Sequence, residues 1–481
     1  MATSIFSELP ASQTNDGNII LSVNGSATTS TSALSEIIAN AGGGTTYTAG
    51  PMIGINNNYI YVNNSACQGY SQYAIAVGGM TTAQGDFSHA EGSGTFAFGP
   101  CTHTEGADTT AYGDFSHAEG VSAYASNYAT HAEGYATTAL GDYSHAEGAG
   151  TYTFGNGTHA EGSGSSAKGN FSHAEGQMSI ANSVASHAEG FQTSAKGLYS
   201  HAEGYYTNTE YEGSHAEGCQ TSALAYASHA EGEKTSAVGQ KSHAEGWYCS
   251  AASNYTHAEG NSTLASGENS HAEGKVTRAI KSCAHAEGDN TSAIGEYSHA
   301  EGGHTLVSGN GSHAECNRTS AIGNYCHSEG SFTLASNIDC HAEGNNTKAV
   351  GGYCHAEGGY TSAGWQNGYS YAMGAHAEGY KTVASGNYSH AEGSATSAIG
   401  IASHSEGYCT IAKGEYSHAA GWQTIANNPK QFVIGQYNVN YSDSIFEIGY
   451  GTSDANRITI FRVDNNGNVS ARGTFTPNIS M

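Results

Sequence analysis

The chain has 481 residues and a formal net charge of −27, with only 15 lysines and arginines against 42 aspartates and glutamates. Without a basic patch, nucleic-acid binding is not expected. No segment approaches the roughly 18 consecutive apolar residues of a membrane-spanning helix, so membrane insertion is not expected either.

Residues 1–70 form a first region that lacks the regularity of the rest. The N-terminal segment has neither the basic nor the apolar part of a signal peptide. Residues 18–23 are predicted to form a strand, and residues 32–40 a short helix that ends at the glycines 42–44. Because this helix is too short to be stable alone, we interpret residues 1–70 as an attachment region, with a loosely attached arm as the alternative.

Residues 71–428 repeat one motif with a 14-residue period, as in Ser298-His-Ala-Glu-Gly302. Of the 25 histidines, 24 lie in this register, from His89 to His418, and only His304 lies outside it. Each unit divides into two similar heptads, and alternate residues of a strand share a face. Ser, Thr and Ala therefore point inward and His and Glu point outward. The pattern predicts an all-β solenoid of about 26 coils with two short strands per coil.

One step in the repeat is 21 residues long instead of 14, between His355 and His376. The seven extra residues, within 364–374, are expected to leave the rod as a loop or to add half a coil. Trp365, Tyr369 and Tyr371 lie in this insertion. They are a candidate receptor-contact loop for a sugar, and packing on the rod is the alternative.

Apolar residues replace His and Glu at both ends of the array. If this face pointed to water, both ends would expose apolar residues, whereas an interface between chains would turn them into apolar layers that close a polar interior. We favour the interface, and we interpret residues 429–481 as a C-terminal capping region with a hairpin over 458–467. The predicted capping layers consist of Ile75, Val77, Phe432, Ile434, Phe446 and Ile448.

The repeated His-x-Glu pair is a candidate for metal binding, for catalysis or for a structural role. Three imidazoles can bind a divalent metal, but an enzyme needs one distinctive site and this pair recurs in almost every coil. We therefore expect no enzyme, no cofactor and a structural ladder, in which Glu accepts from His of a neighbouring chain or layer and raises the pKa of that His. A divalent metal in the ladder is the less favoured alternative. The predicted interface ladder is represented by His89, Glu91, His117, Glu119, His145, Glu147, His299, Glu301, His390 and Glu392.

Two stretches resemble known fibre proteins. Tyr73-Ala-Ile-Ala-Val-Gly78 resembles the repeat of YadA-like trimeric adhesin heads, and Ser-His-Ala-Glu-Gly resembles the repeats of phage and prophage tail fibres. The segments 431–438, 449–457 and 463–473 resemble the part that follows such repeats in phage tail proteins. The resemblance implies a left-handed parallel β-roll assembled as an elongated homotrimer.

These observations together predict a phage tail-fibre protein that binds a host-surface glycan or protein receptor. The N-terminal region would contact other tail or baseplate proteins. The cysteines Cys326, Cys340 and Cys354 each replace an inner Ser and are expected to be free thiols. Free thiols and the missing signal peptide predict assembly in the host cytoplasm and a place in the virion. A bacterial surface adhesin and a metal-binding structural fibre are the alternatives.

Overall fold

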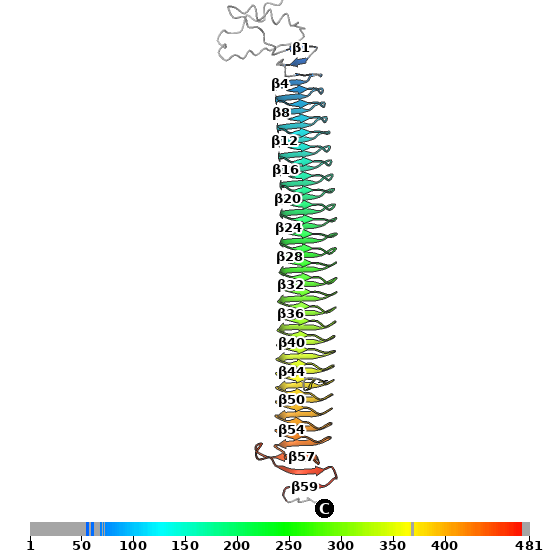
Figure 1. Ribbon diagram of the computed structural model, residues 1–481, viewed down its shortest axis with the longest axis vertical. Coiled ribbons are helices and arrows are strands. Elements are labelled where there is room, and N and C mark those ends of the chain that lie inside the picture. The colour runs from blue at the N-terminus through cyan, green and yellow to red at the C-terminus, as the bar shows by residue number, and fades with distance from the viewer. Residues whose placement is uncertain are drawn as a thin grey trace, which may run out of the picture.

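The computed structural model describes residues 54–56, 59–61, 68–69, 71, 73–366 and 370–473 (Figure 1). The predicted strand over 18–23 and helix over 32–40 lie outside these residues. The described part of the chain contains strands and no helix, and therefore no helix that would be long and apolar enough to cross a membrane. Its strands stack into one straight rod, with the described C-terminal strands at one end (Figure 1).

Each coil contributes one long strand to one parallel β-sheet and one short strand to a second parallel β-sheet. The long strands have five residues and begin, within the array, at a ladder histidine, as in β10 (His117–Val121) and β12 (His131–Tyr135). They run from β4 (Ile75–Gly79) to β56 (Phe432–Gln436). The short strands have two residues and run from β3 (Gln68–Gly69) to β55 (Ile425–Ala426). The predicted β-solenoid of about 26 coils is confirmed.

The coils are stacked in strict 14-residue register. In the long ladder His117 pairs with His131 and Glu119 with Glu133, and the short strands pair in the same way. In-register parallel pairing places identical side chains above one another along the whole rod. The repeat of the sequence therefore becomes continuous rows of one residue type on the surface and in the core.

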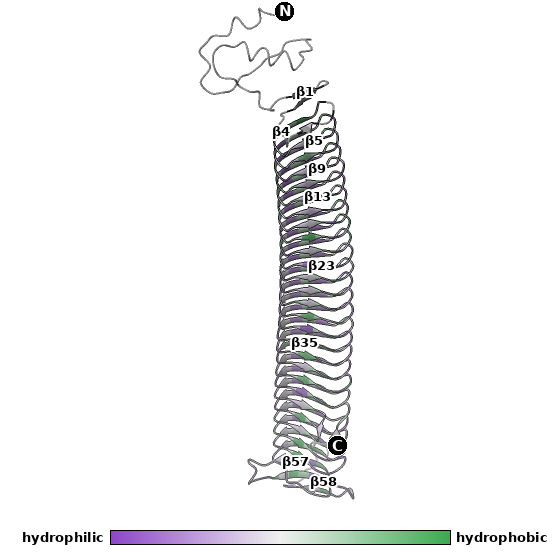
Figure 2. Cartoon of the chain, turned by 45° about the horizontal axis from the view of Figure 1, so that its top comes forward, coloured by the Kyte–Doolittle hydropathy of each residue, from purple (hydrophilic) through white to green (hydrophobic). Residues whose placement is uncertain are grey.

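The core of the rod is made of small side chains. Ala300, Ser298 and Thr305 of one coil are at most 2% exposed, as are their counterparts in almost every other coil. The predicted inward face of Ser, Thr and Ala is confirmed, and the buried cysteines Cys326, Cys340 and Cys354 occupy inner Ser positions. Hydropathy colouring shows strong hydrophobic colour on only scattered strands of the shaft (Figure 2). A core of such small side chains allows the two β-sheets to lie close together.

The glycine that ends almost every motif fits the close stacking of coils. Gly204 has φ of +113°, and a Cβ built on it would lie 2.1 Å from the carbonyl oxygen of Gly218. The motif glycines of neighbouring coils show the same approach, and one coil instead holds Cys316, with φ of +78°. A side chain at this position crowds the backbone of the next coil, so the coil spacing favours glycine.

The seven extra residues of the 21-residue step leave the rod as a small hairpin. Strands β46 (Trp365–Gln366) and β47 (Ser370–Tyr371) pair antiparallel, while His355 pairs directly with His376 across the insertion. The stack is thus uninterrupted, and no half-coil is added.

The C-terminal end changes from parallel to antiparallel pairing. Strand β57 (Ser444–Tyr450) continues the parallel ladder from β56, and β58 (Thr459–Asp464) then pairs antiparallel with β57. The predicted hairpin is confirmed, because β58 also pairs antiparallel with β59 (Val469–Ala471). At the other end, β1 (Gly54–Asn56) and β2 (Tyr59–Tyr61) form an antiparallel pair.

Candidate functional site: the histidine–glutamate ladder

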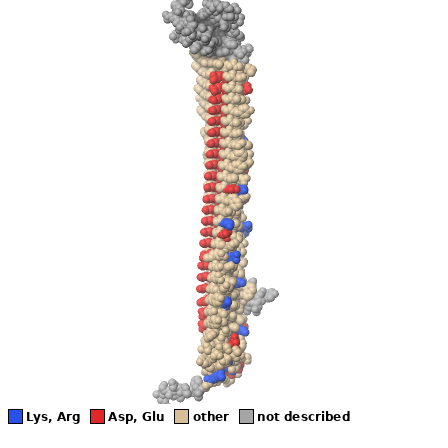
Figure 3. Space-filling model, turned by 90° about the vertical axis from the view of Figure 1, so that its left-hand side faces the viewer, with Lys and Arg blue, Asp and Glu red and all other residues tan. Residues whose placement is uncertain are grey.

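The histidines and glutamates of the motif form two adjacent rows on the outside of the long-strand ladder. The alternation of a strand turns His117 and Glu119 outward and buries Ala118 between them completely. The side chains of this His and Glu are 33% and 38% exposed. The glutamates appear as a continuous acidic stripe along one edge of the rod (Figure 3). We call these two rows, from His89 to His418, the ladder.

The imidazole rings of the ladder stack on one another along the rod. The ring centroids of His103 and His117 are 4.7 Å apart with an angle of 12° between the ring planes, and neighbouring pairs are similar. Tilts of 43° and 42° occur at His327–His341 and at His404–His418. The spacing follows directly from the distance between parallel strands.

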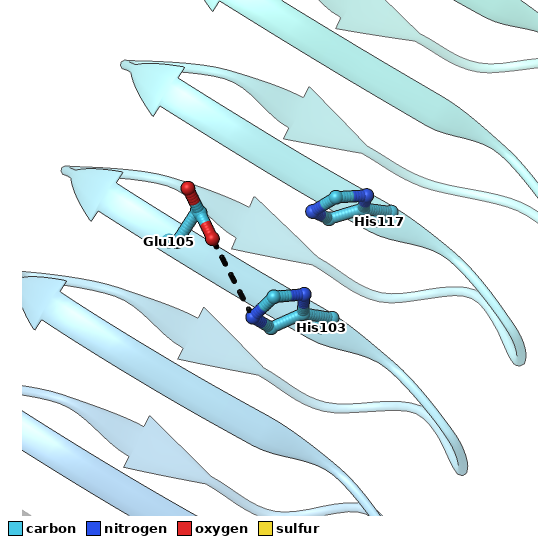
Figure 4. A group of neighbouring side chains, drawn as sticks. All are labelled: His103, Glu105 and His117. Carbon is cyan, nitrogen blue, oxygen red and sulfur yellow. Dashed lines mark ion pairs between the residues drawn. The ribbon is translucent and has the colours of Figure 1, made fainter.

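Each glutamate lies next to the histidine of its own coil through most of the rod. The distance from His Nε2 to Glu Oε2 is 3.7 Å for His89–Glu91, 3.8 Å for His117–Glu119 and 3.9 Å for both His145–Glu147 and His299–Glu301. These distances are too long for strong hydrogen bonds. Figure 4 shows the arrangement for His103 and Glu105, with His117 on the next coil.

The pairing changes near the C-terminal end of the ladder. Glu392 lies 3.5 Å from Nε2 of His404, which belongs to the next coil, instead of pairing with His390. In the same way Glu406 lies 3.3 Å from Nε2 of His418, within hydrogen-bonding distance. The predicted contact between neighbouring layers therefore occurs in these last coils, whereas the coils before them pair His and Glu within one coil.

The Nε2 atoms of the ladder are buried and unsatisfied. Within the described residues, every ladder histidine from His103 to His404 has a buried Nε2 atom without a hydrogen-bond partner. A buried polar atom without a hydrogen-bond partner costs free energy, so this long row of atoms is the candidate binding feature of the rod.

The glutamates act to raise the histidine pKa, as expected, but within the single chain burial and repulsion between histidines outweigh them at half of the ladder histidines. Burial, followed by repulsion from His103, lowers the pKa of His117 below its usual value, although Glu105 and Glu133 act in the opposite direction. Burial of the imidazoles is the larger cause of the lowered pKa, and repulsion between neighbouring stacked rings adds to it. The ladder histidines with lowered pKa are His117, His131, His145, His173, His187, His201, His229, His243, His271, His299, His341 and His376.

The predicted capping residues continue the ladder face at both ends. Ile75 and Val77 pair in register with His89 and Glu91, and at the other end Phe432 pairs with His418. Phe446 and Ile448 follow one strand further along, in register with Phe432 and Ile434. In the single chain Ile75 is 49% exposed and Val77 is 43% exposed.

The predicted receptor-contact loop is described only in part. Trp365 is 51% exposed at the base of the β46–β47 hairpin. Tyr369 lies outside the described residues, as does the side chain of Tyr371. Of these three aromatic side chains, the structure therefore describes Trp365 alone.

Two features were not anticipated from the sequence. Glu447 occupies an inner position in β57, is fully buried and accepts hydrogen bonds from Gln431 Nε2, Asn438 Nδ2 and Thr459 Oγ1. Glu447 is in register with the inner residue Val433, so its burial could have been predicted from the 14-residue period. The second feature is a row of exposed aromatic residues two positions before His, including Phe171 at 70% exposure. Their positive φ angles turn them outward.

The comparison with known families supports the repeat assignment. Residues 286–312 match the family model of the YadA head domain repeat in two copies. No curated protein sequence matches the chain. The chain is thus a β-solenoid repeat protein that carries YadA-like head repeats, an architecture that suggests an adhesin-like fibre.

Proposed function

We propose that the chain forms a homotrimeric fibre of a phage tail, or of a phage-like particle, that binds a receptor on the host surface. The observation that carries the proposal is the composition of the ladder face. This face has apolar residues at both ends, buried Nε2 atoms without partners between them, and an acidic stripe along its length.

Association through the ladder face would cover this face from end to end. Ile75, Val77 and Phe432 would leave water, and neighbouring chains would cover the partly exposed histidine and glutamate side chains between them. In-register rows also suit a symmetric assembly, because every coil presents the same side chains to its partners. With about 26 coils at a spacing of roughly 4.8 Å, the rod would reach about 120 Å from its attachment point.

A bacterial surface adhesin is a second candidate, and the YadA-like repeats support it equally. The two candidates share the trimeric fibre and the receptor-binding role, and they differ in the particle that carries the fibre. The resemblance of the Ser-His-Ala-Glu-Gly repeats to tail fibres leads us to place the fibre on a phage. A catalytic role is not proposed, because the His–Glu pair recurs without a distinctive neighbour in almost every coil.

The experiment is to locate the fibre and to test its adhesion. Antibodies against the rod are applied to purified phage particles and to intact bacteria, and labelling is viewed by electron microscopy. The proposal predicts label on tails and saturable binding of the purified, fluorescent rod to host cells. Label confined to the bacterial surface would favour the adhesin, and a rod that binds no cells would contradict receptor binding in either setting.

A further inference from the structure

The ladder brings nitrogen and oxygen ligands together in a repeated group. One ring nitrogen of His103, one ring nitrogen of His117 and a carboxylate oxygen of Glu105 lie within 4.8 Å of one another (Figure 4). The same grouping recurs along the rod, for example at His131, Glu133 and His145. All of these side chains are partly buried, and both Nε2 atoms of each group are without a hydrogen-bond partner.

The distance within each His–Glu pair fits a shared cation better than a hydrogen bond. Two ligand atoms at about 2.1 Å from one tetrahedral zinc ion are about 3.4 Å apart. The Nε2–Oε2 distance is 3.4 Å in His341–Glu343 and at most 4.0 Å in the other coils whose His and Glu form an ion pair with each other. A strand thus holds the two ligands close to the chelating distance without any further folding.

The third ligand would come from the next coil. Adjacent rings are 4.6 to 5.1 Å apart, so one ring must turn for both Nε2 atoms to reach the same ion. The tilt of 43° between His327 and His341 occurs with the backbone register intact, so the ladder tolerates such a rotation. Two imidazoles and one carboxylate form a familiar ligand set for zinc, with water as the fourth ligand.

We propose that the ladder binds Zn²⁺, with one ion held by each pair of adjacent coils through two histidine Nε2 atoms and one glutamate carboxylate. Because each Nε2 can serve only one ion, the 24 ladder histidines provide at most 12 such sites. The bound ions would also offset the charge of the acidic stripe.

The test uses the full chain, stripped of metal with a chelator that is then removed. Isothermal titration with Zn²⁺ and metal analysis give the stoichiometry, and Co²⁺ is used as a visible probe of low-coordinate N/O ligation. We expect several ions per chain, approaching 12, with an intense Co²⁺ absorption that Zn²⁺ abolishes. Fewer than one ion per chain, or Co²⁺ spectra of a hexaaquo-like ion, would overturn the proposal.

Two block variants locate the bound ions. Replacing the eight ladder histidines from His103 to His201 by Asn should remove about one third of the bound zinc. A second variant replaces the eight glutamates of the same coils by Gln and keeps the stacked histidine rings. If the histidine variant does not fold, the glutamate variant tests zinc binding by these coils. His304→Asn, outside the ladder, is the matched control. Equal zinc binding by the wild type and a folded block variant would also contradict the proposal.

Zinc binding and the proposed trimer are tested separately, because the mass of the particle is measured with and without zinc. A trimer that binds no zinc would refute this inference alone. A monomer that binds zinc at the ladder would support it and would contradict the trimeric fibre.

Discussion

The shaft and the C-terminal cap use the same coil geometry with opposite chemistry. In the shaft the inner face holds Ala, Ser and Thr, and the outer face holds the polar ladder. In the cap, residues 432–473, the outer row becomes Phe432, Ile434, Phe446 and Ile448, while the charged Glu447 lies inside. The difference shows that the fold fixes which positions face inward but leaves the polarity of each face to the sequence.

Substitutions that disturb the spacing between coils should have the largest effect on the free energy of unfolding. Gly204→Ala in the shaft places a Cβ against the carbonyl oxygen of Gly218, and we expect a loss of about 3 kcal/mol or more in the free energy of unfolding. Gly467→Ala in the cap also has a positive φ but has no neighbouring atom within 4 Å, so about 1–2 kcal/mol is expected. Denaturant unfolding followed by circular dichroism compares the two, and equal losses would contradict the steric argument.

Removing a carboxylate should affect the cap more than the shaft. Glu447→Ala removes the buried acceptor of Gln431 Nε2 and one of three acceptors of Asn438 Nδ2, and we expect a loss of about 3 kcal/mol. Glu119→Ala, at a site 38% exposed, should cost less than about 1 kcal/mol. Hydrogen exchange of the β57 and β58 amides reports on the cap separately. Unchanged protection of these amides in Glu447→Ala would show that the buried network does not stabilise the cap.

Aromatic residues should also differ between the two regions. The ring of Phe446 packs against Phe432 and Phe461, with centroids 5.8 and 5.9 Å away, so Phe446→Ala is expected to cost about 1.5 kcal/mol. Tyr143 is 66% exposed, and Tyr143→Ala should cost about 0.5 kcal/mol. Thermal unfolding of both variants tests the order. A larger loss for Tyr143→Ala would indicate that the exposed aromatic row is covered in the native particle.

A change of pH is expected to have the smallest effect per residue on the free energy of unfolding. The direction of this effect differs between the shaft and the cap. The pKa of His117 is lowered by burial and by its neighbours, so the unfolded chain takes up protons first as the pH falls through about 6.5. The shaft should therefore lose stability as the pH falls below this value. Burial raises the pKa of Glu447, so its contribution should weaken as the pH rises above about 4.5.

The pH response of the shaft is measured by denaturant unfolding between pH 8 and pH 5.5 with a chelator present. Histidine is the side chain whose usual pKa lies within this range, so the histidines dominate the change. Stability that rises as the pH falls would contradict the lowered pKa values. It would instead indicate that the glutamates control the charge of the ladder.

Most of the fold could be predicted from the sequence because a single 14-residue period runs through the shaft. Alternation within Ser298-His-Ala-Glu-Gly302 was sufficient to assign the buried and exposed faces, and the structure confirms both. The capping residues Phe432 and Phe446 were also placed on the correct face, since they keep the 14-residue register.

The electrostatics of the site were less predictable, because they depend on distances between coils. The repeat shows His next to Glu along the strand, but it does not show that the rings stack at 4.7 Å and repel one another when protonated. The exposure of Phe171 could not be predicted for a similar reason. Its outward direction follows from a left-handed backbone at the turn, which residue size alone does not reveal.

The central claim is that the ladder face is an interface between copies of the chain. The most direct test is the mass of the native particle in solution, measured by light scattering across a range of protein concentrations. The account predicts a mass near three times 49.4 kDa, which decreases when Ile75 and Val77 are both replaced by Asp. A stable monomer at all concentrations would contradict the claim and would leave the ladder facing water.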